Sequence, residues 1–272
     1  MNNLTENKIQ KIVDWLKEYL KTSGAKGYVI GLSGGVDSTA TAALAVEAVG
    51  VDNVYGLILP LYLPNENERP EDIKDAKFVA NYLNINYDIL YLSNALNDFV
   101  EQMDLTTELK TIPNIKARIR MTALRAKAEK LDYLVLGTTN LIEDKIGYFT
   151  KGGDGGSGVD IEPIADLYKS EVFQVCECYG FPDHIARRTP TAGLYDEQTD
   201  EKEIGYSYEI LDNYFAINNL IVKNNANVFA IVKAFNNFKM KFNLSDDDLD
   251  KIATMVSKSD HKRNVAPKCC LL

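Results

Sequence analysis

The sequence predicts an α/β protein: a doubly wound parallel sheet, Rossmann-like in layout, flanked by helices and extended by further helices at both ends. Short apolar segments alternate with longer segments of helical periodicity in the first half of the chain. The short segments are mainly apolar and do not alternate with polar residues in a regular way, as strands do when helices cover both faces of a parallel sheet. The most informative turns, residues 31–38, 60–70 and 137–160, follow the ends of these segments, where such sheets bind ligands.

The elements of the first half follow one another in a regular order. Residues 5–21 are expected to form a helix, because Ile9, Val13 and Leu16 recur at helical spacing. Four short apolar segments are expected to be strands: residues 27–32, 51–59, 86–92 and 132–136. Between them, four segments are expected to be helices: residues 39–49, 71–83, 95–103 and 114–130. The three prolines of residues 60–70 predict a loop.

The second half of the chain lacks the alternation of strand-like and helix-like segments. Residues 147–160 hold six glycines and are expected to form a mobile loop. A helix is expected over residues 166–179 with Asp166 as its N-cap, and a loop over residues 189–200. Helical spacing returns in three segments, residues 201–215, 226–239 and 246–257, and the tail after them shows no periodicity. Without internal repeats or low-complexity linkers, residues 1–272 are expected to be one domain.

Composition and charge exclude several classes of function. The 30 basic and 39 acidic residues give a net charge of −9, so the field of the protein opposes nucleic acid, and no nucleic-acid partner is expected. No apolar run approaches the roughly 20 residues that cross a bilayer. With no signal-peptide pattern either, we expect a cytoplasmic protein without a membrane partner. The four cysteines form no CxxC pair, which argues against a zinc site.

A glycine- and serine-rich turn is the most specific feature of the sequence. Residues 33–38 read SGGVDS, and they follow an expected strand and open an expected helix. Consecutive glycines let several backbone N–H groups point at one anion, and the helix N-terminus behind them adds a positive dipole end. The turn lacks the lysine of a Walker loop, so its cationic charge must come from elsewhere. Asp37 would repel phosphate unless a divalent cation lies between them, which predicts a bound divalent cation.

The motifs of this sequence resemble those of a known family. The SGGxDS turn is similar to the pyrophosphate-binding loop of the N-type ATP pyrophosphatases, whose fold is called adenine nucleotide alpha hydrolase-like. Further strings resemble the NAD synthetase family in the same order: NIKARIRM, GTTNLIED, GYFTKGGDGG, VDIEPIADLYKSEV, RTPTAGLYDEQTDE and HKR. The resemblance implies a ligase that amidates deamido-NAD with free ammonia through an acyl-adenylate, giving NAD, AMP and pyrophosphate. It also implies a homodimer and, at this chain length, no glutaminase domain.

The resemblance implies roles for particular residues. Its ATP contacts match Gly31, Leu32, Ser33, Gly34, Gly35, Val36, Asp37, Ser38, Thr138, Lys169 and Thr191. The Mg²⁺ carboxylates match Asp37 and Glu143, and the deamido-NAD contacts match Arg118, Lys151, Asp160, His261 and Lys262. Lys169 is expected to supply charge during adenylation, and Asp154 to orient or deprotonate ammonium. The glycine-rich loop and the HKR segment are expected to close over the reacting adenylate.

Some residues depart from the family pattern and leave alternatives open. Gly152 stands where the family usually has an aromatic residue, and Ser157 and Gly158 lengthen the same loop. These changes concern the acid substrate more than ATP. The same chemistry on another carboxylate, such as nicotinate mononucleotide, is therefore an alternative. A tRNA-modifying enzyme and a non-catalytic nucleotide-binding module are more remote alternatives.

Overall fold

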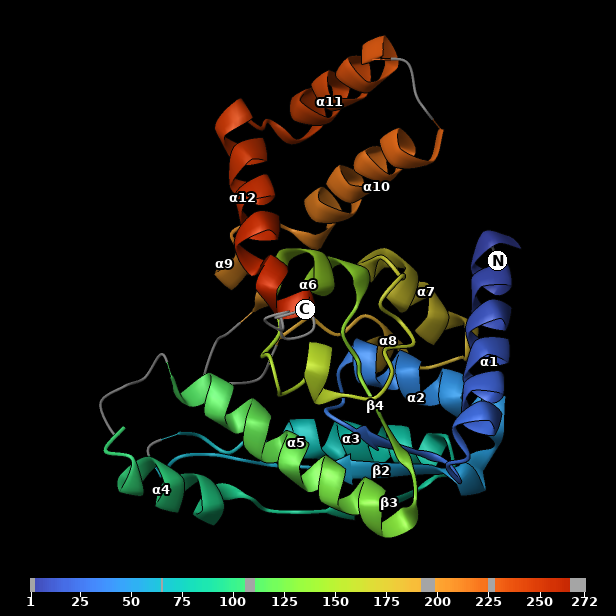
Figure 1. Cartoon of the computed structure of the whole chain (residues 1–272), viewed down its shortest axis with the longest axis vertical. Coiled ribbons are helices and arrows are strands. Elements are labelled where there is room, and N and C mark those ends of the chain that lie inside the picture. Colours follow the sequence, from blue (N-terminus) through green and yellow to red (C-terminus); the bar gives the residue numbers. More distant parts are fainter. Residues whose placement is uncertain (1–2, 65, 106–110, 192–198, 225–227, 265–272) are drawn as a thin grey trace, which may run out of the picture.

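A parallel sheet of four strands lies among helices in the lower part of the molecule as Figure 1 draws it. The computed structural model describes residues 3–64, 66–105, 111–191, 199–224 and 228–264. The strands lie in the order β3–β2–β1–β4, and they are β1 (Tyr28–Gly31), β2 (Val54–Ile58), β3 (Asn86–Ile89) and β4 (Leu134–Leu136). Ile30 of β1 pairs in parallel with Gly56 of β2 and with Leu136 of β4. The predicted parallel direction of the strands is confirmed.

Helices cover both faces of this sheet, which confirms the doubly wound class. Alternate residues of β1 point to opposite faces, since Ile30 belongs to one buried cluster and Val29 to another. The first face packs against α1 (Asn3–Ser23), α2 (Val36–Val49), α3 (Pro70–Tyr82), α7 (Lys169–Cys178) and α8 (Asp183–Ala186). The second face packs against α5 (Ile112–Leu131), which in turn contacts α4 (Ser93–Gln102).

A group of helices from the second half of the chain packs around its own apolar cluster (Figure 1). These helices are α6 (Leu141–Ile146), α9 (Asp200–Ile204), α10 (Tyr208–Asn224), α11 (Val228–Phe242) and α12 (Asp246–Arg263). Ile142 and Ile252 are fully buried in this cluster, which also includes Phe238. Because α6 follows β4 directly, the group stands over the edge where the strands end. Among the described helices, none has both the length and the hydropathy needed to cross a bilayer.

Several predicted boundaries are wrong. The second strand is shorter than predicted, because Val51–Asn53 forms a 3₁₀ turn. The helix predicted from residue 166 begins at Lys169, so Asp166 is not its N-cap. The first two N–H groups of this helix instead donate to the carboxylate of Asp212, from Lys169 at 3.2 Å and from Ser170 at 3.0 Å. This cap comes from α10, and no local pattern announces it.

The glycine-rich segment and the HKR segment are also more regular than predicted. Residues 147–160 contain a Lys151–Gly155 bridge and a 3₁₀ turn, Gly156–Gly158. The HKR residues lie on the last turn of α12, whereas the sequence suggested an irregular tail. The helices α6 and α8 were not predicted. Residues 192–198 of the expected 189–200 loop, and residues 265–272 of the tail, lie outside the described part of the chain.

Gly147 allows α12 to approach the end of α6. It adopts a φ of +71°, and a Cβ atom there would lie 2.1 Å from the Cβ of Ser259. We expect Gly147→Ala to lower the free energy of unfolding by about 2–4 kcal/mol, since overpacking adds to the left-handed backbone strain. Urea unfolding measures this loss. Gly152 is a matched control, because its φ is +73° and nothing lies within 4 Å. An equal loss in Gly152→Ala would refute a role for the helix contact.

Candidate active site

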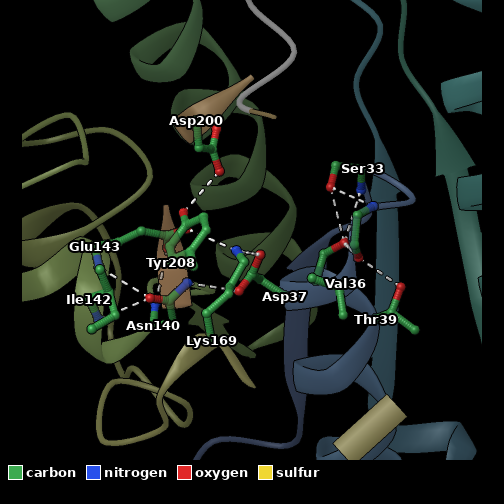
Figure 2. A network of polar contacts seen from close by, with 12 residues as sticks. Ser33, Val36, Asp37, Thr39, Asn140, Ile142, Glu143, Lys169, Asp200 and Tyr208 are labelled. Atoms are coloured by element: carbon green, nitrogen blue, oxygen red, sulfur yellow. Dashed lines mark hydrogen bonds and ion pairs between the residues drawn. The ribbon is translucent and has the colours of Figure 1, made fainter. Parts of the chain in front are cut away.

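The SGGVDS turn lies between β1 and α2, at the edge where the strands end (Figure 2). Gly34 has a φ of +75°, and a Cβ atom there would lie 2.7 Å from the Cβ of Asp75, so only glycine fits. The hydroxyl of Ser38 donates to the Gly35 carbonyl at 3.0 Å, and that of Ser33 accepts from the Gly35 N–H at 3.2 Å. These bonds fix the turn, while the first N–H groups of α2 have no carbonyl partner within their helix.

The turn opens on a cavity of about 280 Å³ at the same edge of the sheet. Its walls come from the turn itself, from the segment after β2, from α5, from residues 138–154, from residues 188–191 and from Asp200. Of the residues that the sequence predicted to contact ATP, the turn residues except Gly34, together with Thr138 and Thr191, line this cavity. The expectation that ligand-binding segments gather beyond the strand ends agrees with this arrangement.

A buried lysine joins two carboxylates next to the cavity (Figure 2). The ammonium group of Lys169 lies 2.6 Å from Asp37 Oδ2 and 3.2 Å from Glu143 Oε1. Lys169 is fully buried, and it reaches this position because α7 packs on α2. Asn140 Nδ2 donates to the other oxygen of Asp37 at 3.0 Å, while Asn140 Oδ1 caps α6 by accepting from the Glu143 N–H at 3.1 Å.

A tyrosine links this group to the helices above it (Figure 2). The Tyr208 hydroxyl lies 3.1 Å from Glu143 Oε1 and 3.0 Å from Asp200 Oδ2. The ammonium of Lys169 lies 4.6 Å from the centre of the Tyr208 ring, within the range of a cation–π contact. Three carboxylates, one lysine and one phenol therefore form a single network. Burial, with Glu143 and Asp200, raises the pKa of Tyr208 and keeps its phenol protonated.

The charges of the network influence one another. Burial alone lowers the pKa of Lys169, but Asp37 and Glu143 outweigh it and hold that pKa above its ordinary value. Burial raises the pKa of Glu143 to about 7, against the opposing charge of Lys169 and with the help of Asp37. Lys169 therefore stays charged at neutral pH, and its charge is balanced by two acids. Its expected contribution to adenylation stays a prediction.

The donor set suits a divalent cation shared with phosphate. Asp37 and Glu143 already converge on one cation, the Lys169 ammonium. In the described part of the chain, no three His, Cys, Asp or Glu side chains are gathered into a self-sufficient metal site. Two carboxylates completed by phosphate and water oxygens are what Mg²⁺ ordinarily takes. The residues present therefore fit a Mg²⁺ ion that arrives with a nucleotide.

Four of the five predicted acid-binding residues lie at the first half of the glycine-rich loop, and the fifth, Asp160, is the last residue of that loop. The Arg118 guanidinium donates to the Lys151 carbonyl at 3.3 Å, and the Lys151 ammonium donates to the His261 carbonyl at 2.7 Å. The Lys262 ammonium donates to the carbonyls of Gly147 and Phe149, both at 2.8 Å. The end of α12 is therefore bonded to this loop.

Asp160 and Asp154 occupy different positions. Asp160 forms an ion pair with Arg125 at 2.5 Å and accepts from the N–H of Val135 in β4 at 2.7 Å. Asp154 lines the cavity and accepts from the N–H of Thr150 at 2.7 Å. Although its carboxyl reaches water through the cavity, the surrounding protein atoms raise its pKa by desolvation. Asp154 is thus a cavity carboxyl with a proton affinity above the ordinary value.

Several residues of the site were missed by sequence reasoning. Asn140, Tyr208 and Asp200 complete the network, and Arg120 and Arg188 line the cavity. Tyr208 lies 65 residues from Glu143 in the chain, in a segment with ordinary helical spacing, so no local signal marks it. Asn140 did carry a signal, because Asn followed three residues later by Glu is typical of a capping box.

The fold and this site define a nucleotide-binding protein whose glycine- and serine-rich turn, with two acids beside it, faces a cavity at the edge of a parallel sheet. The chain belongs to the NAD synthase family, whose model matches residues 8–266. The family predicted from the sequence motifs is therefore confirmed.

Curated relatives and solved structures agree with this membership. An NH(3)-dependent NAD(+) synthetase of Thermococcus kodakarensis is 45% identical over 75% of this chain and 77% of the relative. One of Pyrococcus furiosus is 38% identical over 95% of each chain. An NMN synthetase structure from Francisella tularensis has a TM-score of 0.80 and 33% identity over 97% of this chain and 98% of that one. An NH3-dependent NAD synthetase of Campylobacter jejuni shares the fold, with a TM-score of 0.75, 24% identity and 99% coverage of both chains.

Proposed function

We propose that this chain is a carbon–nitrogen ligase that uses ATP to amidate deamido-NAD with free ammonia, giving NAD, AMP and pyrophosphate. The observation that carries the proposal is the anion-binding turn placed beside Asp37 and Glu143 at the mouth of a cavity. The names of the curated relatives support the same reaction. We also propose that the chain acts as a homodimer and that residues 1–272 form one domain.

The reaction has two steps with balanced chemistry. An oxygen of the nicotinate carboxylate forms a bond to the α-phosphorus of ATP. The bond between that phosphorus and the oxygen bridging to the β-phosphorus breaks, and pyrophosphate leaves with the electron pair. Ammonia then attacks the acyl carbon, loses a proton, and AMP leaves with the original carboxylate oxygen. Most of the catalysis is positioning and charge stabilisation, which agrees with a site that has no nucleophile–base pair among the residues described.

The residues of the chain have separate tasks in these steps. The N–H groups of the turn and of the first turn of α2 bind phosphate oxygens. Asp37 and Glu143 would hold Mg²⁺, which supplies charge neutralisation on the phosphates when bound. Lys169 keeps the two carboxylates together, and Asn140 orients Asp37. Asp154, with its raised pKa, accepts a proton from ammonium or from the attacking amine.

A second acid substrate deserves a direct comparison. The Francisella tularensis structure, similar over nearly the whole chain, is described as an NMN synthetase. Nicotinate mononucleotide carries the same carboxylate as deamido-NAD and lacks the adenylyl half. Gly152 follows Lys151, which we propose to contact the acid, and Ser157 and Gly158 lengthen the same loop. The mononucleotide is therefore the second candidate.

Pyrophosphate release distinguishes the two acids. Purified protein is incubated with ATP, Mg²⁺ and ammonium, and with deamido-NAD or nicotinate mononucleotide in turn, and the amide product is identified by mass spectrometry. We expect deamido-NAD to give a kcat/KM about tenfold or more above that of the mononucleotide, a difference of about 1.4 kcal/mol. The reverse order would favour the second candidate, and no pyrophosphate with either acid would contradict the proposal.

Lys151→Ala tests the acid side of the site. We expect the KM for the acid to rise about tenfold or more, because one charged hydrogen bond is worth about 1.5–3 kcal/mol. The affinity for ATP, measured by calorimetry, should change by less than about twofold, since Lys151 bonds to the loop and to α12 and not to the turn. Lys145→Ala is the control, because Lys145 is a solvent-reaching lysine of α6 that pairs only loosely with Asp144 at 3.9 Å. A large loss of ATP affinity in Lys151→Ala would show that the loop is wrongly assigned.

A further inference from the structure

The cavity holds a triphosphate only if positive charge reaches it. Of the described cavity-lining residues, Asp37, Asp72, Glu143, Asp154 and Asp200 are acidic. The lining cations in the described part of the chain are Arg120 and Arg188. Lys169 is fully buried behind the cavity wall and donates to Asp37 and Glu143, so its ammonium does not line the cavity. An ATP tail with up to four negative charges therefore needs an additional cation near the turn, besides any metal ion.

Arg188 is the cation placed at the turn itself. Its Nη1 donates to the carbonyl of Gly34 at 3.3 Å and to Asp75 Oδ2 at 2.9 Å, and its Nη2 pairs with Asp72. A Cβ atom at Gly34 would lie 3.0 Å from Arg188 Nη1, so the backbone of the turn and the guanidinium are packed against each other. The side chain is 21% exposed, enough to reach the cavity and little enough to be held in one position.

Arg120 has a different position. Its Nε donates to the carbonyl of Leu59 at 3.1 Å, just after β2. Burial lowers its pKa, and the nearby acids include Tyr62 and Asp154. Arg120 therefore belongs to the α5 wall of the cavity, whereas Arg188 contacts the anion-binding turn.

We propose that Arg188 is a phosphate-binding residue of this site, which holds the pyrophosphate part of ATP and the pyrophosphate product. The inference rests on the proposed function and adds a residue to it. A guanidinium has five N–H donors in a planar fork, and the contacts above account for three of them. Asp72 and Asp75, both on α3, orient the fork before a ligand arrives, which reduces the entropy lost on binding. Arginine suits this task because its planar guanidinium can donate hydrogen bonds to two phosphate oxygens at once.

Binding of three ligands distinguishes this role from a structural one. ATP, inorganic pyrophosphate and AMP are titrated, each with Mg²⁺, into the full chain and into Arg188→Gln. We expect the affinities for ATP and pyrophosphate to fall about tenfold or more, as for the loss of a charged hydrogen bond to phosphate, and that for AMP to change by less than about twofold. Equal losses for all three ligands, or unchanged affinities for ATP and pyrophosphate, would overturn the proposal.

Two further variants sharpen the test. Arg187→Gln is the matched control, because Arg187 is adjacent, pairs with Glu177 at 2.6 Å and is 66% exposed, away from the cavity. It should leave all three affinities unchanged. Arg188→Lys keeps the positive charge and loses the planar set of guanidinium donors. If Arg188→Gln does not fold, this variant tests whether Arg188 binds phosphate. In that variant we expect ATP and pyrophosphate to bind about threefold or more weakly with AMP unaffected, and no such selectivity would overturn the proposal.

The wild-type titrations separate this inference from the proposed function. If the wild-type chain binds neither ATP nor pyrophosphate, both the function and the role of Arg188 are wrong. If it binds both ligands and Arg188→Gln binds them equally well, only the role of Arg188 is wrong.

Discussion

Asp37→Asn is expected to reduce pyrophosphate release by about 10²–10³-fold, the usual effect of losing one preorganised electrostatic partner of a transition state. The substitution keeps the shape of the side chain and removes its charge. Asp37 now accepts from Lys169 at 2.6 Å and from Asn140 at 3.0 Å, so the variant keeps a polar group in the same place. What it loses is the carboxylate proposed to hold Mg²⁺ beside the phosphates.

The measurement is initial-rate pyrophosphate release over a range of Mg²⁺ concentrations. We expect the Mg²⁺ concentration for half-maximal rate to rise in Asp37→Asn as the maximal rate falls. Asp52→Asn makes the same chemical change at an exposed position of the 3₁₀ turn, and it should behave as wild type. A rate for Asp37→Asn close to that of wild type would exclude Asp37 from the metal site.

Lys169→Met is expected to cost about 3–5 kcal/mol of unfolding free energy at about pH 8, and also to abolish turnover. Methionine fills a similar volume, so the loss is not mainly one of packing. Without the ammonium, Asp37 and Glu143 face each other with no counter-charge between them. Breaking a buried ion pair in this way leaves uncompensated charge, which is more costly than removing both partners.

The pH dependence of this variant has a definite sign. The pKa of Glu143 in the folded protein is already raised to about 7, and removing Lys169 raises it further. A carboxyl whose pKa is higher in the folded state than in the unfolded state, where it is about 4.3, destabilises the fold as pH rises between the two values. The loss in Lys169→Met should therefore be smaller at about pH 5 than at about pH 8.

Urea unfolding at the two pH values measures this difference. Lys241→Met is the control, since Lys241 and Glu209 form an exposed pair whose side chains are 57% and 67% accessible. Exposed pairs contribute about 0–1 kcal/mol, so the control should change stability little at either pH. A loss in Lys169→Met that is independent of pH, or as small as that of the control, would contradict the buried network.

The fold was predictable because short apolar segments and segments of helical periodicity alternate several times along the chain. β1, β2 and β4 are short, mainly apolar segments, and the turn at residues 33–38 combines residue types that few other structures need. The edge strand β3 reads NYDI and carries a weaker signal. The helix boundaries were less predictable where another element supplies the cap. Asp212 of α10 fixes the start of α7, and bonds from Lys262 to the glycine-rich loop accompany the helical last turn of α12.

The site was predictable in part for the same reason. Asp37, Glu143 and Lys169 lie in motifs that resemble the family, and the structure brings the three together. The balance of their charges was not predictable, because it depends on how close their side chains lie in the fold. Lys169 is 26 residues from Glu143 and 132 residues from Asp37 along the chain. Arg188 has an ordinary arginine context in the sequence, and only the packing of Gly34 against it shows its relation to the turn.

Isotope transfer tests the central claim that this site joins the acid to the α-phosphorus of ATP. Deamido-NAD with heavy oxygen in its carboxylate is incubated with wild-type protein, ATP, Mg²⁺ and ammonium, and the AMP is analysed by mass spectrometry. An acyl-adenylate predicts AMP that carries one heavy oxygen atom on its phosphate and unlabelled pyrophosphate. Unlabelled AMP, or ADP formed together with labelled inorganic phosphate, would contradict it.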